Sequence, residues 1–378
     1  AYEAAQKANE GTVSARAEAV LDTALKTMCA AYDCLKRGQE TREPLEIDVP
    51  ERKILLKDDG TVDRVIVPDR LDAHKLIEEF MIQANVAAAE TLEAKQQTLI
   101  YRVHDTPTLA KLESLADFLR TLDMRIAKGS VLKPSDFNGI LRQVAGKDSE
   151  ELVNNVVLRS QSQAVYDIAN LGHFGLNLRK YAHFTSPIRR YADLTVHRAL
   201  IAALGLGTDG MTTGQEDRLA DIAADISDFE RRAMAAERET KDRLIARHLS
   251  DQIGAQFSAR IGGVTKAGLF VTLSETGADG FVPIRELGDE YFVFDEARHL
   301  LVGEQSGLGY QMGDQVDVRL TEAAPIAGAL RFDMVSEGKS GYGLERSRPT
   351  NRRRGSGKNT GGIRHRRPSE KRGGRRQR

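Results

Sequence analysis

The segment from His173 to Asp193 constrains the fold of this 378-residue chain more than any other stretch. Ser186 followed by Pro187 predicts a helix start, because a serine hydroxyl can cap free backbone amides and proline at the first helical position gives up no needed donor. The residues beyond repeat at intervals of three and four, which predicts one buried helix face. The residues of this face are Ile188, Ala192, Thr195 and Ala199.

Two arginines, Arg189 and Arg190, fall in the first turn of this predicted helix. Positive side chains are unfavourable there, because the helix dipole already places positive charge at that end. The pair is explained if an anion such as a phosphate binds where backbone amides, hydroxyls and guanidinium groups converge. The alternative is an ordinary capped helix in which Arg189 pairs with Asp193 one turn later, and the residues alone leave both interpretations open.

The motifs HFGL at residues 173–176 and YAHFTSPIRRYADL at residues 181–194 resemble the most recognisable segment of the catalytic RNB domain of the ribonuclease II and ribonuclease R family. The resemblance covers roughly residues 1–337 and implies the C-terminal part of such a domain. It implies that Arg189 is catalytic and stabilises charge on the scissile phosphate. It also implies RNA contacts from Tyr181, His183, Thr185, Ser186 and Arg190.

Two glutamates are further candidates for the catalytic site. An amphipathic helix is predicted from Pro68 to about Ala94, with an apolar arc formed by Ile77, Phe80, Met81, Ala84 and Ala88. Its segment HKLIEEFMIQAN resembles a second block of the family, which implies that Glu78 faces the RNA channel and that Glu79 is solvated or paired. In a second predicted helix, at 216–250, the match to the family implies that Glu237 lies near the RNA 3′ end. Without the resemblance, both glutamates read as ordinary surface charges.

The pattern as a whole predicts an α+β chain in three parts: a mainly helical part at 1–250, an all-β part at 251–337 and a tail at 338–378. Five short β-like segments with glycine corners predict a small closed barrel after residue 250. The run GVTKAGLFV resembles an S1 domain, an OB-fold that binds RNA. Such folds stack bases on aromatic rings beside basic groups. The candidates are Phe257, Phe270 and Phe281 for stacking and Lys266 for the backbone, although each phenylalanine also fits a core position.

Charge is distributed unevenly along the chain. Residues 338–378 hold 15 lysines or arginines against Glu345 and Glu370, a net charge of +13, and the rest of the chain carries −13 because the total is zero. The tail has too few apolar residues to offset its ordering entropy, so we expect it to be disordered. We also expect it to bind RNA phosphates without sequence preference and with strong salt dependence.

The composition excludes some classes of protein. No run of about 18 apolar residues is present, so the sequence predicts no membrane span. The cysteines, Cys29 and Cys34, are too few for a disulfide framework or a four-ligand zinc site, which indicates a reducing cytoplasm. The chain begins at Ala1 rather than at methionine, so we expect it to be a fragment of a longer protein.

The resemblance implies metal-dependent hydrolysis, in which carboxylates hold Mg²⁺ that activates water and stabilises the leaving oxygen. The chain contains no Asp-rich loop of suitable spacing. Asp58 and Asp59 precede a turn glycine and are typical of a hairpin. We therefore predict no metal ligand within the chain and expect the Mg²⁺ ligands upstream of Ala1.

Two functions remain open from the sequence. The first is a portion of a processive, monomeric 3′-to-5′ exoribonuclease that binds single-stranded 3′ ends and releases 5′-mononucleotides, inactive without its upstream aspartates. The second is a non-catalytic RNA-binding protein that uses the S1 barrel and the basic tail. An Asp-rich block in the upstream coding sequence would favour the first.

Overall fold

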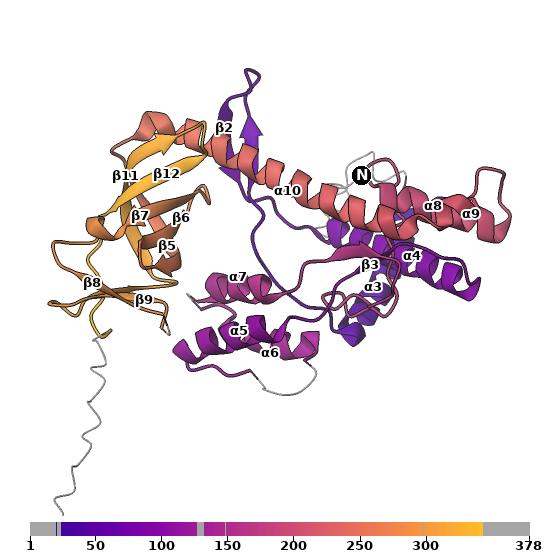
Figure 1. The fold of residues 1–378 in the computed structure, drawn as a ribbon, viewed down its shortest axis with the longest axis horizontal. Helices are drawn as coiled ribbons and strands as arrows, with labels where there is room; N and C mark the ends of the chain where they lie inside the picture. The colour runs from indigo at the N-terminus through magenta and orange to yellow at the C-terminus, as the bar shows by residue number, and fades with distance from the viewer. Residues whose placement is uncertain (1–19, 21–23, 127–131, 148, 297, 343–378) are drawn as a thin grey trace, which may run out of the picture. The chain divides into compact units, whose positions relative to one another are not determined.

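The structure is a computed structural model that describes residue 20 and residues 24–126, 132–147, 149–296 and 298–342. The described residues belong to one compact unit, in which a mainly helical part is followed by a β-barrel (Figure 1). The predicted three-part order of helical domain, barrel and tail therefore holds for the first two parts. The tail beyond residue 342 lies outside the described residues, and its disorder stays a prediction.

The helical part contains two short two-stranded sheets among its helices. Its elements are α3 (Lys26–Arg42), β1 (Lys53–Leu56), β2 (Val62–Ile66), α4 (Asp72–Ala94), β3 (Tyr101–Val103), α5 (Leu109–Thr121), α6 (Pro134–Val144), α7 (Glu150–Ser160), β4 (Val165–Asp167), α8 (Tyr191–Leu204), α9 (Thr213–Glu216) and α10 (Leu219–Leu249). The predicted hairpin at Asp59–Gly60 joins β1 to β2, and the two long predicted helices are α4 and α10. These predictions are confirmed.

Helix α7 ends at Ser160, and after four intervening residues the chain forms β4, which pairs with β3. Two local predictions are wrong. The apolar arc of α4 is misplaced, since Ile77 is 48% and Phe80 40% exposed. The buried face of α4 instead contains Leu76, Glu79, Ile82, Asn85, Ala88, Ala89 and Leu92. Ile188, expected in a helical stripe, is fully exposed.

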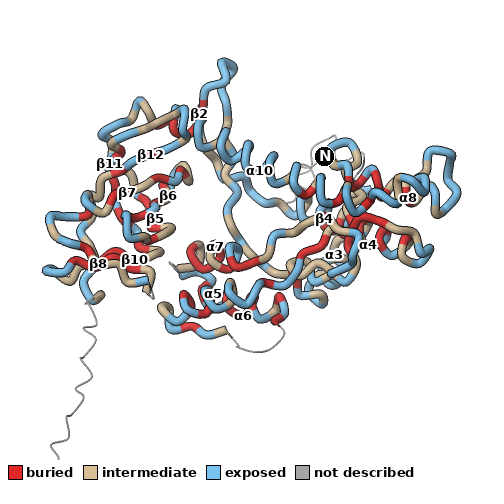
Figure 2. The backbone as a smooth tube through the Cα atoms, viewed as in Figure 1, coloured by how far each residue is buried: buried red, intermediate tan, exposed pale blue. Residues whose placement is uncertain are grey.

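The position of α10 links the two described parts (Figure 2). Near its start, Leu219 and Ala223 pack in a cluster with Ile100 and Ala192 of the helical part. Near its end, three side chains lie in the barrel core: Ile245, Ala246 and Leu249. Residues 231–240 between these ends are exposed on every side. The helix is therefore anchored by its two ends.

The barrel is closed in the strand order β11-β12-β7-β6-β5, which confirms the five-stranded prediction. Its strands are β5 (Gln256–Thr265), β6 (Gly268–Leu273), β7 (Asp279–Pro283), β11 (Gln315–Ala324) and β12 (Ala329–Met334). Short 3₁₀ turns lie at Ser250–Gln252 and Ile284–Glu286. Gly280 is needed in the core, because a Cβ there would lie 2.1 Å from the Phe332 ring.

A further β-sheet, formed by the residues between β7 and β11, was not predicted from the sequence. It is antiparallel in the order β10-β9-β8, formed by β8 (Phe292–Asp295), β9 (Leu300–Gly303) and β10 (Gly309–Gln311). Lys339 forms a bridge with Gly309, and its Nζ lies 2.6 Å from Asp314 Oδ1. The described start of the predicted tail thus contacts this part of the chain. Within the described residues, no helix is long and apolar enough to cross a membrane.

Candidate functional site

The helix predicted to begin at Pro187 begins four residues later. Pro187 to Arg189 form a turn in which the Ser186 carbonyl accepts hydrogen bonds from the Arg189 and Arg190 amides at 3.2 and 3.1 Å. Arg190 is extended, with φ −127° and ψ 121°, and α8 starts at Tyr191. The two arginines therefore lie at the N-cap of α8 and directly before it, not in the first turn of the helix.

A buried carboxylate holds this turn in place. Asp193 is fully buried, and its Oδ1 accepts a 2.7 Å hydrogen bond from the Ser186 amide. Its two oxygens also accept 2.8 Å hydrogen bonds from Nε and Nη2 of Arg190. The alternative of an arginine–Asp193 pair is thus realised, but by Arg190 rather than Arg189.

Arg189 differs from its neighbour in its surroundings. Its side chain is exposed, and the described residues offer its guanidinium no hydrogen bond or ion pair. Thr185 is half-buried, yet its Oγ1 is buried without a hydrogen-bond partner among the described residues. Of the two arginines, Arg189 has no partner for its guanidinium among the described residues, whereas Arg190 commits Nε and Nη2 to Asp193.

Asn85 of α4 binds the motif from the other side. Its Nδ2 donates to the Tyr181 hydroxyl at 3.0 Å. Its Oδ1 accepts hydrogen bonds from the amides of Phe184 and Thr185 at 2.9 and 3.2 Å. One buried amide side chain therefore satisfies three groups of the motif and fixes it against α4.

His183 lies on the buried side of the motif. Its Nδ1 is 2.9 Å from the Tyr166 hydroxyl, and Arg102 lies over the Tyr166 ring while its guanidinium donates to both carboxylate oxygens of Glu230 at 2.5 and 2.9 Å. Burial, followed by the positive charges of Arg190 and Arg102, lowers the pKa of His183 to about 2. His183 is therefore neutral near pH 7 and contributes no positive charge to the site.

Two half-buried histidines, His173 and His183, predict a steep loss of stability in acid. Burial also lowers the pKa of His173 to about 3. Below pH ~6.5 an unfolded histidine takes up a proton that the folded one refuses, so each histidine should lower the free energy of unfolding by about 1.4 kcal/mol per pH unit as the pH falls. In urea titrations between pH 4 and 6, His183→Gln is expected to reduce the slope of the unfolding free energy against pH by about 1.4 kcal/mol per pH unit, the contribution of one proton. Tyr166→Phe, which removes the hydroxyl but no titrating histidine, should leave the slope unchanged. An identical slope in His183→Gln and wild type would contradict the prediction.

A pocket of about 390 Å³ brings three of the predicted residues together. Glu78, Tyr181 and Arg190 all line it, although the first lies about a hundred residues from the other two. Apolar side chains complete the walls, among them Ile77, Met81 and Leu176. Glu78 is exposed and pairs with Arg70 at 2.6 Å. An apolar pocket with one carboxylate and one guanidinium suits a nucleotide end, whose base is apolar on its faces and whose sugar and phosphate are polar.

Glu79, expected to be solvated or paired, is buried and paired. Its Oε1 lies 3.3 Å from Nη2 of Arg42, on α3. Burial raises the pKa of Glu79, with the Arg42 charge acting in the opposite direction. This pair joins α3 to α4 and lies on the face of α4 that Asn85 also occupies. The Arg42–Glu79 pair therefore has a structural role, because it connects two helices.

Glu237 lies in a different place. It is exposed on α10 and pairs with Lys241 at 2.7 Å. It lines a pocket of about 440 Å³ with Gln163 and Arg238, which shares no lining residue with the Glu78 pocket. Within the described residues the structure does not bring Glu237 beside Glu78, and the catalytic role of Glu237 stays a prediction.

The four barrel candidates occupy different environments. Phe270 is 50% exposed, and its ring centroid lies 5.1 Å from that of Phe281, its cross-strand neighbour. Phe257 is partly buried and packs against the barrel core. Lys266 is exposed in the turn between β5 and β6. The accessible aromatic pair is therefore Phe270 with Phe281.

Four residues near the site were not predicted from the sequence: Asn85, Arg331, Arg102 and Glu230. Asn85 contacts residues of the motif about a hundred positions later in the chain, and Arg331 is the cross-strand neighbour of Phe281. The Arg102–Glu230 pair joins segments 128 residues apart. Each depends on long-range contacts, so its sequence context alone carried no signal beyond a polar residue in a family block.

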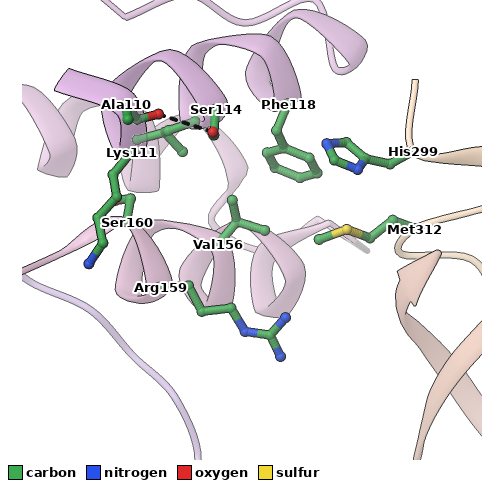
Figure 3. Close-up of a pocket in the computed structure, with 10 residues that line it drawn as sticks. Ala110, Lys111, Ser114, Phe118, Val156, Arg159, Ser160, His299 and Met312 are labelled. Atoms are coloured by element: carbon green, nitrogen blue, oxygen red, sulfur yellow. Dashed lines mark hydrogen bonds between the residues drawn. The ribbon is translucent and has the colours of Figure 1, made fainter. Parts of the chain in front are cut away.

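A third, mainly apolar pocket contains none of the predicted residues (Figure 3). It encloses about 320 Å³, and its walls include Phe118, Val156, His299 and Met312.

The part of the chain that the structure describes contains no group of three or more histidine, cysteine, aspartate or glutamate side chains able to hold a metal ion. These residues therefore do not fit a Mg²⁺ site.

Two domain families match this chain. The RNB domain matches residues 1–205, and the S1 RNA binding domain matches residues 250–325. Ribonuclease R of Escherichia coli is 34% identical over 341 residues, which cover 88% of this chain and 42% of that protein. Ribonuclease R of Vibrio cholerae is 38% identical over 320 residues, covering 82% of this chain and 39% of that protein.

Solved structures agree with this grouping. The apo form of Mycoplasma genitalium RNase R has a TM-score of 0.81 at 28% identity and covers 88% of this chain and 52% of that one. The same protein in complex with ribose-methylated single-stranded RNA has a TM-score of 0.80. The chain spans about two fifths of the length of these curated relatives. It belongs to the RNB-domain family, and an S1 RNA-binding domain follows its RNB part.

Proposed function

We propose that this chain is the RNA-binding C-terminal part of a 3′-to-5′ exoribonuclease that degrades single-stranded RNA to 5′-mononucleotides. The observation that carries the proposal is the pocket in which Glu78, Tyr181 and Arg190 meet next to the exposed Arg189 turn. Relatives named Ribonuclease R, one of them solved with single-stranded RNA, support it. We propose that the protein acts as a monomer in the cytoplasm.

The parts of the chain would divide the work. Phe270 and Phe281 would stack bases of the incoming strand on the barrel surface. The Glu78 pocket would hold the last nucleotide, and Arg189 would meet the phosphate whose charge grows during cleavage. Glu237 would contact the strand from α10, at a pocket separate from that of Glu78. Hydrolysis in such an enzyme would require Mg²⁺ held by carboxylates, and we assign no step to a metal within the described residues.

Recognition of a 3′ end can be tested with two RNAs of one sequence, one linear and one closed into a circle. We expect the chain to bind the linear RNA more tightly, because only that RNA can place an end in the Glu78 pocket. Fluorescence anisotropy at fixed salt measures both affinities. Glu78→Gln should reduce the difference in affinity between the linear and the circular RNA. The control is Lys75→Gln, a change at an exposed position of the same helix outside the pocket. Equal affinity for the two RNAs would favour the alternative, a non-catalytic S1-type RNA-binding protein.

Loss of the barrel aromatics should weaken RNA binding directly. Stacking of one base on an aromatic ring contributes about 1–3 kcal/mol, so Phe270→Ala is expected to lower the affinity for single-stranded RNA roughly 5- to 150-fold. Phe281→Ala should have a similar effect. The control is Tyr291→Ala, which removes a 71% exposed aromatic outside the β6–β7 surface. Equal losses for Phe270→Ala and Tyr291→Ala would show that the β6–β7 pair has no special role.

A further inference from the structure

Three arginines from distant segments line one polar pocket of about 410 Å³. Arg52 precedes β1, Arg159 lies near the end of α7, and Arg260 lies on β5. Two carboxylates, Glu151 and Asp279, line the same pocket. None of these residues belongs to the Glu78 pocket or to the aromatic pair of the barrel.

Backbone carbonyl groups hold the three guanidinium groups in place. Arg159 donates to the Gly262 carbonyl at 3.4 Å and Arg260 to the Gly313 carbonyl at 3.0 Å. Arg52 reaches the Ser274 carbonyl at 3.5 Å and packs on Gly277, whose φ is +66°. A Cβ at Gly277 would lie 2.3 Å from Cδ of Arg52, so a larger residue there would displace the Arg52 side chain from its present position.

The carboxylates in the pocket do not balance these charges. Glu151 lies 3.9 Å from Nη2 of Arg52 and 3.8 Å from Nε of Arg260, which is beyond hydrogen-bond length. Asp279 accepts a 2.6 Å hydrogen bond from the Thr272 hydroxyl. Three guanidinium groups thus line the pocket with two carboxylates, and Glu151 lies between Arg52 and Arg260 at ion-pair distance from both. Counted over these five side chains, the lining of the pocket carries one net positive charge.

We propose that this pocket binds a phosphate group of the RNA backbone, beside the barrel and apart from the 3′ end. The inference rests on the proposed function, since it names a second contact for the same strand. A planar guanidinium fork binds two phosphate oxygens at once, and several forks on one phosphate form charge-assisted hydrogen bonds. Glu151 then occupies the bridging position while the site is empty and competes with the anion for the arginines.

Because Glu151 would compete with the anion, replacing Glu151 should change the binding affinity in the opposite direction to replacing an arginine. Inorganic phosphate and a single-stranded RNA are the two probes, with chemical shifts of labelled arginine Nε groups and anisotropy as the readouts. Arg159→Gln should weaken the binding of both probes and reduce the salt slope of RNA affinity by about 0.7, the value for one phosphate of a single strand. Glu151→Gln should tighten both. Arg120→Gln, which removes the same charge from an exposed position of α5, should leave phosphate binding unchanged.

Each other outcome overturns the proposal in a separate way. If both Arg159→Gln and Glu151→Gln lower the melting temperature and neither changes phosphate or RNA binding, the cluster only joins α7 to the barrel. If phosphate binding responds as expected but the RNA salt slope does not, the site takes free phosphate and the assignment to the RNA backbone is wrong. Failure of the proposed function is seen separately, as equal binding of linear and circular RNA.

Discussion

Replacing Asp193 with alanine is expected to lower the free energy of unfolding by about 3–5 kcal/mol, the range for breaking one partner of a buried ion pair. The Asp193 side chain is fully buried, and Arg190 retains 19% exposure. Removing the carboxylate leaves the Arg190 guanidinium poorly solvated and unpaired. It also leaves the Ser186 amide without its acceptor, so the turn before α8 loses its main anchor.

Chemical denaturation monitored by circular dichroism measures this effect. Asp72→Ala is the matched control, because Asp72 pairs with Lys75 at the same i,i+3 spacing but is exposed, with a side chain 73% accessible. An exposed pair of this kind contributes about 0–1 kcal/mol. If the two aspartates cost the same stability, the burial of Asp193 carries no energetic weight and the argument fails.

Arg189→Lys is expected to slow cleavage roughly 10²–10³-fold in an RNB enzyme with a complete metal site, the loss typical of one preorganised donor. The expected loss of rate rests on the difference between the two arginines. Arg190 forms two hydrogen bonds with Asp193, whereas the side chain of Arg189 is exposed. A lysine keeps the charge but cannot bind two phosphate oxygens in a plane. RNA affinity should change far less, because many other contacts hold the strand.

Arg190→Lys is the companion variant, and the structure changes what we expect of it. It should lower stability, because lysine cannot reproduce the two hydrogen bonds to Asp193. Single-turnover cleavage, a binding titration and a melting curve for both variants separate the two effects. Equal losses of rate and affinity in Arg189→Lys would make Arg189 a ground-state binder, and no loss in either would assign it to an ordinary exposed turn.

Local patterns were sufficient for most of the architecture. Alternation and glycine corners predicted the five barrel strands, and helical spacing predicted α4 and α10, because each pattern reflects one element that buries one face. The motifs of residues 173–194 were sufficient for the RNB family, and the run at 263–271 for the S1 domain. The same motifs named Tyr181, Arg190 and Glu78, which the structure brings into one pocket.

Only the tertiary structure decided where these elements begin and what their polar residues contact. Ser186–Pro187 has the local signature of a helix start, yet α8 begins at Tyr191. The Ser186 amide and the Arg190 guanidinium both donate hydrogen bonds to the Asp193 carboxylate, and these contacts hold residues 186–190 in a turn before the helix. Burial of the carboxylate of Glu79 depends on Arg42, a partner 37 residues away. Local sequence determines which backbone conformations are favourable, whereas the free energy of burying a charge depends on a partner that only folding supplies.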